Sequence, residues 1–169
     1  MQSYGRRIFR PSNKKNMKIL FVCLGNICRS PMAEFIMKKM VADAGLSEQF
    51  EIASAATSTW EIGNPVYPPA RRKLAEHNIS CKGKTARQMT RGDYDYYDLI
   101  IGMEQKNLRD ILAITGEDRL GKVALLMDFT DTPHDIADPW YTGDFDATWN
   151  DVSKGCAALI AKYGKNPVK

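Results

Sequence analysis

The sequence predicts a single-domain α/β fold, a three-layer sandwich in which helices cover both faces of a four-stranded parallel sheet. Short apolar runs alternate along the chain with longer stretches whose apolar residues recur at helical spacing. Strands separated by helices join a sheet through βαβ crossovers, which make the strands parallel and place helices on its faces. The 169 residues, 44% hydrophobic and 26% charged, are typical of a globular protein with one sizeable core.

The folded part is expected to cover residues 17–169. Residues 1–16 contain Arg6, Arg7, Arg10, Lys14 and Lys15, no acidic residue and no apolar periodicity. We therefore expect a poorly packed basic extension at the N-terminus. Docking of this extension on an anionic surface is the alternative interpretation.

Four short apolar runs bounded by turn residues are predicted to be buried strands. They are Ile19–Val22, Phe50–Ser54, Leu99–Gly102 and Lys122–Met127. In open parallel sheets, ligands bind outside the carboxyl ends of the strands. A functional site is therefore expected in the loops that follow Val22, Ser54 and Met127.

Four segments are predicted to be helices. The first begins with Ser30 as its cap and Pro31 as its first residue, and Gly45 ends it. The others are Ala70–His77, Glu104–Ile114, with Leu108, Ile111 and Leu112 inward, and about Asp146–Tyr163, with Cys156 on its apolar face. Residues 55–68 and the acidic residues 128–144 are predicted to be long loops.

Composition narrows the class of protein. The four cysteines are too few for a disulfide scaffold, so reduced thiols in a cytoplasmic protein are expected. No Cys/His cluster has the spacing of a zinc site, and no metal or cofactor is expected. The net charge of +4 permits anionic ligands but does not indicate nucleic acid. No apolar run is long enough for a membrane span or has the form of a signal peptide.

The residues that carry chemistry follow the first predicted strand directly. They read Cys23-Leu24-Gly25-Asn26-Ile27-Cys28-Arg29-Ser30-Pro31. A loop of five residues between a cysteine and an arginine can curl into a nest of inward N–H groups that holds one phosphoryl group. The positive end of the following helix favours a thiolate, the nucleophilic form of cysteine. An arginine offers a planar fork to two phosphate oxygens. We call Cys23–Arg29 the phosphate loop.

A second cysteine and arginine with the same spacing, Cys81 and Arg87, lack this context. No apolar strand precedes them and no capped helix follows, so we interpret the match as coincidence. Gly83-Lys84-Thr85 likewise resembles the end of a nucleotide-binding loop, but Asn78 stands where that motif needs glycine.

Several motifs resemble one known family. Val22–Pro31 resembles the signature of the low-molecular-weight protein tyrosine phosphatases, Asp138-Pro139-Trp140-Tyr141 resembles their second motif, and Asp98–Met103 resembles an internal segment. The resemblance covers about residues 17–163. It implies a protein tyrosine phosphatase that acts on phosphotyrosine-containing proteins, with a cognate tyrosine kinase as a candidate partner.

The resemblance also implies roles for single residues. Cys23 would attack phosphorus, Arg29 would bind the equatorial oxygens, and Asp138 would protonate the leaving phenolate and then activate water. Asn26 would hold the shape of the loop, and Ser30 would hydrogen-bond the thiolate. The remaining phosphate-binding positions of the loop would be Leu24, Gly25, Ile27 and Cys28.

Some of these residues have plain alternatives. Asp138 lies among five other aspartates, and acidic loops are usually just solvated. Trp60, Trp140 and Tyr141 are expected to wall a deep slot for a phenyl ring, although large aromatics also serve ordinary packing. Cys28 is expected to form a disulfide with an oxidised Cys23, although it could be a small buried apolar residue.

Two segments depart from the family pattern. Relatives carry an Asp-Pro-Arg-Ala-like segment where this chain has Tyr67–Ala70, and often a histidine that supports the phosphate loop where alignment on Ala86-Arg87-Gln88 places Lys84. These changes affect the support of the loop rather than its chemistry.

Three other functions fit the sequence less well than phosphotyrosine hydrolysis does. An arsenate reductase would need relay cysteines, whereas Cys81 stands alone in its stretch. A phosphoarginine hydrolase would have a threonine-like residue where this chain has Ile27. A non-catalytic phosphate-binding module would need neither nucleophile nor acid.

Overall fold

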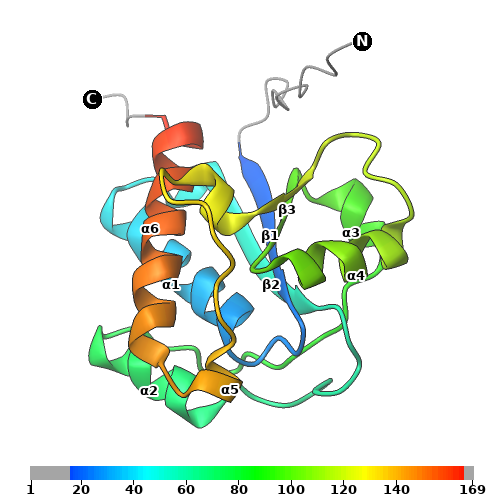
Figure 1. The fold of residues 1–169 in the computed structure, drawn as a ribbon. Coiled ribbons are helices and arrows are strands. Elements are labelled where there is room, and N and C mark those ends of the chain that lie inside the picture. The colour runs from blue at the N-terminus through cyan, green and yellow to red at the C-terminus, as the bar shows by residue number, and fades with distance from the viewer. Residues whose placement is uncertain (1–15, 166–169) are drawn as a thin grey trace.

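The predicted fold class is confirmed by a computed structural model, which describes residues 16–165. Its sheet has four parallel strands in the order β2-β1-β3-β4 (Figure 1). The strands are β1 (Met17–Cys23), β2 (Phe50–Ala56), β3 (Leu99–Gly102) and β4 (Val123–Leu125). The predicted extension, apart from Asn16, lies outside the described residues.

Helices cover both faces of the sheet. They are α1 (Arg29–Asp43), α2 (Pro68–Glu76), α3 (Arg91–Tyr96), α4 (Gln105–Thr115), α5 (Pro139–Thr142) and α6 (Phe145–Tyr163), with short 3₁₀ turns at Ser47–Gln49 and Leu126–Phe129. Figure 1 shows α1 and α6 on one side of the sheet and α3 and α4 on the other. The loop after β1 and helix α5 lie together at the lower edge.

The position of β1 inside the sheet, between β2 and β3, explains why the sequence of this strand is almost wholly apolar. Ile19 and Phe21 are fully buried in the cluster that includes residues of α1 and α6. Leu20 and Val22 are fully buried in a second cluster with Tyr94 of α3 and other residues of the opposite face. A parallel strand buried on both faces has no solvated side to carry polar residues. It therefore holds the residue at its carboxyl end in a fixed position.

Several predicted bounds differ from those in the structure, and the differences at α1 and β4 have a clear physical reason. Helix α1 begins at Arg29 rather than Pro31, and no side chain caps it. Ser30 lies inside the first turn, where its hydroxyl is engaged by Asn26 and Cys23 instead of by backbone N–H groups. The run Lys122–Met127 is a strand only over Val123–Leu125, because the chain turns into a 3₁₀ helix at Leu126.

Helix α3 was not predicted, and one predicted side-chain direction is wrong. Helix α3 has only six residues, and it starts where the Asp93 carboxylate accepts the backbone N–H of Thr90 at 2.8 Å. Leu112, expected to point inward, is exposed, whereas Asn107 and Ile111 are the residues of α4 that lie fully buried. The acidic loop of residues 128–144 also contains the short helix α5, which Pro139 begins.

Within residues 16–165, no helix is both long and apolar enough to cross a membrane.

Candidate functional site

The phosphate loop turns from the carboxyl end of β1 into the first turn of α1. Asn26 adopts the left-handed backbone conformation, with φ of 59°, which asparagine tolerates better than most residues. Its buried side-chain amide donates to Ser30 Oγ at 2.8 Å and to Ser54 Oγ at 2.9 Å. Its side-chain oxygen, Oδ1, accepts the backbone N–H of Arg87 at 3.3 Å. These contacts fix Asn26, and Asn26 in turn fixes the curl of the loop.

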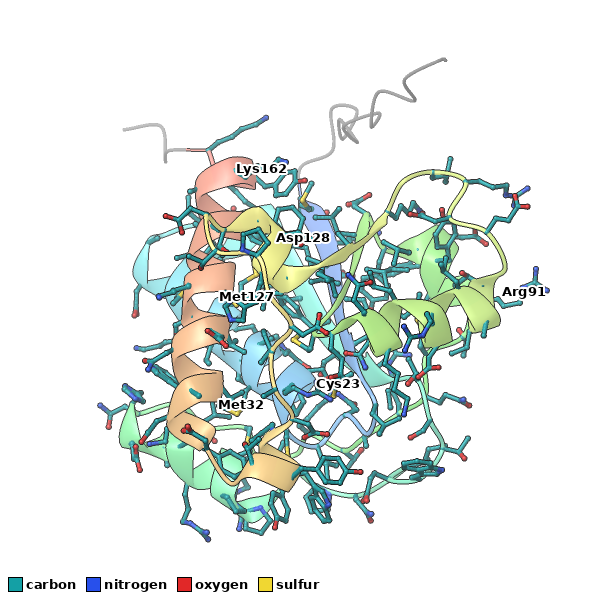
Figure 2. The ribbon with its side chains drawn as sticks, viewed as in Figure 1. Cys23, Met32, Arg91, Met127, Asp128 and Lys162 are labelled. Atoms are coloured by element: carbon teal, nitrogen blue, oxygen red, sulfur yellow. The ribbon has the colours of Figure 1, made fainter. Side chains whose placement is uncertain are left out.

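The Cys23 sulfur lies at the end of β1 with two polar neighbours. The backbone N–H of Asn26 donates to the sulfur at 3.3 Å, and Ser30 Oγ lies 3.0 Å from it. Figure 2 shows Cys23 where the strand meets the loop, beside the start of α1. Only 3% of the residue is exposed. The sulfur therefore lies in a confined space within hydrogen-bonding distance of the Asn26 N–H and the Ser30 hydroxyl.

Arg29 joins the loop to two other elements. Its guanidinium donates from Nη1 to the carbonyl oxygen of Ile136 at 3.0 Å. The same group contacts Asp138 Oδ2 at 3.3 Å and Glu104 Oε2 at 3.4 Å. The arginine is almost fully buried, so these two carboxylates balance its charge. Arg29 thus holds the segment that carries Asp138 beside the phosphate loop.

A buried ion pair between Glu34 and Lys84 supports the phosphate loop. Ser54 Oγ, which accepts from Asn26, donates to Glu34 Oε1 at 2.6 Å. Lys84 Nζ lies 3.1 Å from the same carboxylate oxygen and donates to the carbonyl oxygen of Ser54 at 2.9 Å. Burial alone would raise the pKa of Glu34, but the hydrogen bonds from Lys38 and Ser54 and the charges of both lysines lower it. Glu34 therefore remains an ionised partner for Lys84.

The phosphate loop forms the floor of a pocket of about 220 Å³. Eleven residues line it: Cys23, Leu24, Gly25, Ile27, Cys28, Arg29, Trp60, Glu61, Asp138, Trp140 and Tyr141. The exposed fractions of the three aromatic residues are 71% for Trp60, 51% for Trp140 and 76% for Tyr141. These rings therefore stand at the mouth of the pocket rather than in the core.

The Tyr67–Ala70 departure from the family pattern contributes to this mouth. The ring of Tyr67 packs on the ring of Trp140, with the centroids 4.7 Å apart. It also contacts the ring of Phe145 at 6.2 Å. The backbone N–H of Tyr67 donates to the carbonyl oxygen of Ile27 at 2.9 Å. Tyr67 thus braces one aromatic wall against the phosphate loop.

The structure separates Asp138 from the other acidic residues of its loop. Asp138 is the only aspartate among the pocket-lining residues of the described chain. Its second oxygen, Oδ1, accepts the backbone N–H of Trp140 at 3.0 Å, which orients the carboxylate at the start of α5. Asp128, by contrast, lies toward the opposite end of the molecule from Cys23 (Figure 2).

Sequence reasoning missed the acidic neighbours of the site. Glu104 is the second residue after β3, so the rule that ligands gather at the carboxyl edge of the sheet could have identified it. Glu61 gave no such signal, because it lies within the long loop after β2 and reaches the pocket only through the course of that loop.

Comparisons with known proteins agree with this geometry. The family model of the low molecular weight phosphotyrosine protein phosphatases matches residues 18–169. The low molecular weight protein-tyrosine-phosphatase YfkJ of Bacillus subtilis is 36% identical over 151 residues, which cover 88% of this chain and 97% of YfkJ. The human low molecular weight phosphotyrosine protein phosphatase is 36% identical over 149 residues, which cover 85% of this chain and 94% of the relative. The chain belongs to this family.

The solved structures that the chain resembles include both tyrosine and arginine phosphatases. The crystal structure of YfkJ superimposes with a TM-score of 0.85 at 35% identity, covering 89% of this chain and 96% of that one. The Drosophila arginine phosphatase DARP gives a TM-score of 0.80 at 26% identity, covering 89% of this chain and 100% of that one. By class the protein is a protein-tyrosine-phosphatase, a phosphoric monoester hydrolase.

The other cysteines of this phosphatase lie in different surroundings. Cys28 lines the pocket, and burial, followed by the neighbouring Cys23, raises the pKa of its thiol. Cys156 is fully buried in the core, as its place on the apolar face of α6 predicts. Cys81 is buried outside the pocket. All four thiols are free, and no cluster of metal-ligating side chains occurs in residues 16–165.

Proposed function

We propose that this protein hydrolyses phosphotyrosine in proteins through a phosphocysteine intermediate on Cys23, with Asp138 as general acid and base. The observation that carries the proposal is the single pocket in which Arg29 contacts Asp138 at 3.3 Å and the Cys23 sulfur accepts from the loop backbone. Binding alone would need neither a nucleophile nor an acid. A phosphatase needs both, together with fixed donors for the phosphoryl oxygens.

The first chemical step transfers the phosphoryl group to the enzyme. Inward N–H groups of the loop and the Arg29 guanidinium bind the equatorial oxygens and balance their charge. The Cys23 thiolate forms the S–P bond while the P–O bond to tyrosine breaks. Asp138 gives its proton to the leaving phenolate oxygen, which avoids expulsion of a charged phenolate.

The second step returns the enzyme to its starting state. Asp138, now a carboxylate, takes a proton from a water molecule that attacks phosphorus. The S–P bond breaks, inorganic phosphate leaves and the Cys23 thiolate forms again. Ser30 Oγ, 3.0 Å from the sulfur, can donate to this leaving thiolate. Asn26 and the ionic group of Glu34 and Lys84 keep the loop in shape through both steps.

The walls of the pocket support phosphotyrosine over phosphoserine. The phosphoryl group must reach the Cys23 sulfur, which is almost buried, while Trp60, Trp140 and Tyr141 surround the entrance. A phenyl spacer carries phosphorus much farther from the peptide backbone than a serine methylene does. Aromatic walls also favour an aryl ring.

Phosphoarginine is the second candidate, because an arginine phosphatase shares this fold. Its side chain is also long, so the depth of the pocket does not exclude it. Ile27 lines the pocket directly after Asn26 and offers a guanidinium no polar partner. We therefore propose Ile27 as the residue that favours an aryl group.

A panel of phosphotyrosine, phosphoserine and phosphoarginine peptides tests the proposed function. We expect kcat/KM for phosphotyrosine to exceed that for phosphoarginine at least about tenfold, or roughly 1.4 kcal/mol in transition-state binding. Ile27→Thr should narrow this gap, and Trp60→Ala should weaken aryl substrates most. Comparable rates on phosphoserine would show that the pocket does not select by length, and a preference for phosphoarginine would replace the proposed substrate.

The cellular location, the protein substrates and the domain boundary of the enzyme are also proposals. We place it in the cytoplasm, which agrees with its four free thiols. Its substrates would be phosphotyrosine proteins made by a cognate tyrosine kinase. Residues 1–16 would be an appendage to the phosphatase domain of residues 17–169.

Cys28 is expected to protect the active site during oxidation. Peroxide oxidises the Cys23 thiolate to a sulfenic acid, and the Cys28 sulfur displaces water from it to form a disulfide that thiols reduce. Because the pKa of Cys28 is raised, disulfide closure should accelerate as pH rises. Recovery of activity with dithiothreitol after peroxide should therefore be much lower in Cys28→Ser. Absence of a Cys23–Cys28 bond in mass spectra of mildly oxidised protein would exclude this role.

A further inference from the structure

A second cavity of the phosphatase is larger than the active-site pocket. A cavity of about 450 Å³ lies between α2 and the turn that follows it. Its lining residues are Pro65, Val66, Arg71, Ala75, Asn78, Ile79, Ser80, Cys81, Lys82, Gly83 and Lys84. None of them lines the pocket above Cys23. The cavity is therefore separate from the site of phosphoryl transfer.

Hydrogen-bonded backbone shapes the walls of this cavity. Helix α2 ends where Asn78 takes the left-handed conformation, with φ of 61°, and the N–H of Ile79 donates to the carbonyl oxygen of Leu74 at 3.0 Å. The chain then turns, with φ of 86° at Gly83 and a hydrogen bond from Lys84 N–H to the Cys81 carbonyl oxygen at 3.2 Å. The cavity is thus framed by a helix end and a closed turn.

The lining combines positive charge with an apolar floor. Arg71, Lys82 and Lys84 are its charged members, and no carboxylate lines it. Val66, Ile79 and Cys81 are buried. Burial raises the pKa of the Cys81 thiol, and the charge of Arg71 opposes this rise, so the guanidinium acts on the interior of the cavity. Such a lining complements an anionic group attached to an apolar body.

We propose that this cavity is a second ligand site, which takes a small organic anion and through Lys84 changes turnover at the active site. The anionic group would lie near Arg71 and Lys82, which form no ion pair with a carboxylate within residues 16–165. The apolar body would lie against Val66 and Ile79. A volume of about 450 Å³ accommodates a bicyclic aromatic acid.

Lys84 connects the cavity to the phosphate loop. Its side chain lines the cavity, while its ammonium group lies 3.1 Å from Glu34 and donates to the Ser54 carbonyl oxygen at 2.9 Å. Ser54 Oγ accepts from Asn26, which shapes the loop. An anion in the cavity competes with Glu34 for the Lys84 charge. Weaker support of Ser54 and Asn26 then lowers the rate of phosphoryl transfer.

Binding is tested with 1-naphthoate as the probe and backbone amide NMR as the readout. We expect saturable shifts of the amides of residues 79–84, and an affinity at least fivefold weaker when Arg71→Gln and Lys82→Gln are combined. Arg72→Gln, on the same helix but outside the cavity lining, is the matched control and should bind like the wild type. The neutral analogue 1-naphthalenemethanol should bind at least fivefold more weakly than naphthoate. Amide shifts confined to the active-site pocket, or equal binding of 1-naphthoate and 1-naphthalenemethanol, would overturn the proposed second ligand site.

Turnover of an aryl phosphate tests the coupling. Naphthoate that merely enters the active-site pocket raises KM and leaves kcat unchanged, because saturating substrate displaces it. Naphthoate in the second cavity should lower kcat at least twofold, and the Arg71→Gln, Lys82→Gln protein, with unchanged basal turnover, should lose this effect. An unchanged kcat in protein whose cavity amides show saturation would overturn the coupling. Because basal hydrolysis is measured in every variant, this failure is distinct from a failure of the proposed phosphatase mechanism.

Discussion

Cys23→Ser is expected to lower turnover of phosphotyrosine peptides by at least about 10⁴-fold. The hydroxyl of serine is far less nucleophilic than a thiolate at neutral pH. No other side chain can take over, since Cys28 is the only other cysteine in the described pocket and burial raises the pKa of its thiol. Steady-state hydrolysis of a phosphotyrosine peptide, with an intact mass spectrum of the variant, measures the loss.

Binding separates loss of the nucleophile from loss of the site. The serine variant keeps the loop N–H groups and Arg29, so it should still bind a phosphotyrosine peptide with an affinity that calorimetry can measure. Cys156→Ser, a cysteine of the core away from the pocket, is the control that should retain turnover once its folding is verified. Turnover near the wild-type rate in the Cys23→Ser protein would exclude the covalent mechanism.

The sheet could be predicted from the sequence because its strands are buried on both faces. Ile19 and Phe21 face one cluster and Leu20 and Val22 the other, so the run has no polar interruption that could disguise it. Helix α3 gave no comparable signal, since it has six residues and Tyr94 is its only buried side chain. Its start depends on the Asp93 carboxylate, a local hydrogen bond that carries no periodicity.

The residues that hold the phosphate loop in shape were harder to predict than the residues that carry the chemistry. Cys23 and Arg29 are six positions apart in one loop, so sequence spacing alone suggests that they meet. Glu34 lies four residues before Lys38, a spacing that is typical of an ion pair on a solvated helix face. In the structure the sheet covers Glu34, whose side chain is only 6% exposed beside Lys84. Which face of α1 packs on the sheet depends on residues distant in sequence, and no local pattern contains that information.

Helix α4 gives a second example of this limit. Its predicted apolar stripe included both Ile111 and Leu112, which are adjacent and point about 100° apart around the helix. The structure buries Ile111 and leaves Leu112 exposed. The amphipathic pattern therefore predicted the helix, but the rotation of the helix about its axis followed from packing against the sheet.

Asp138→Asn is expected to lower kcat by about 10²–10⁴ for phosphotyrosine and other substrates with poor leaving groups. An asparagine amide can keep the hydrogen bond from the N–H of Trp140, which Asp138 Oδ1 accepts at 3.0 Å, but it cannot give a proton to the phenolate. The variant also loses one carboxylate beside Arg29, while Glu104 remains at 3.4 Å to hold the guanidinium. Binding of the substrate should therefore suffer much less than turnover.

The leaving group distinguishes an acid from a merely structural aspartate. Phenols of low pKa depart as anions without a proton, so the loss of kcat in Asp138→Asn should shrink steadily as the phenol becomes more acidic. Asp128→Asn is the matched control, because this exposed aspartate lies toward the opposite end of the molecule from Cys23 (Figure 2) and should leave kcat unchanged for every substrate. A loss that stays equal across a series of aryl phosphates would mean that Asp138 only positions Arg29. A loss that grows with the pKa of the leaving phenol would assign the proton transfer to Asp138.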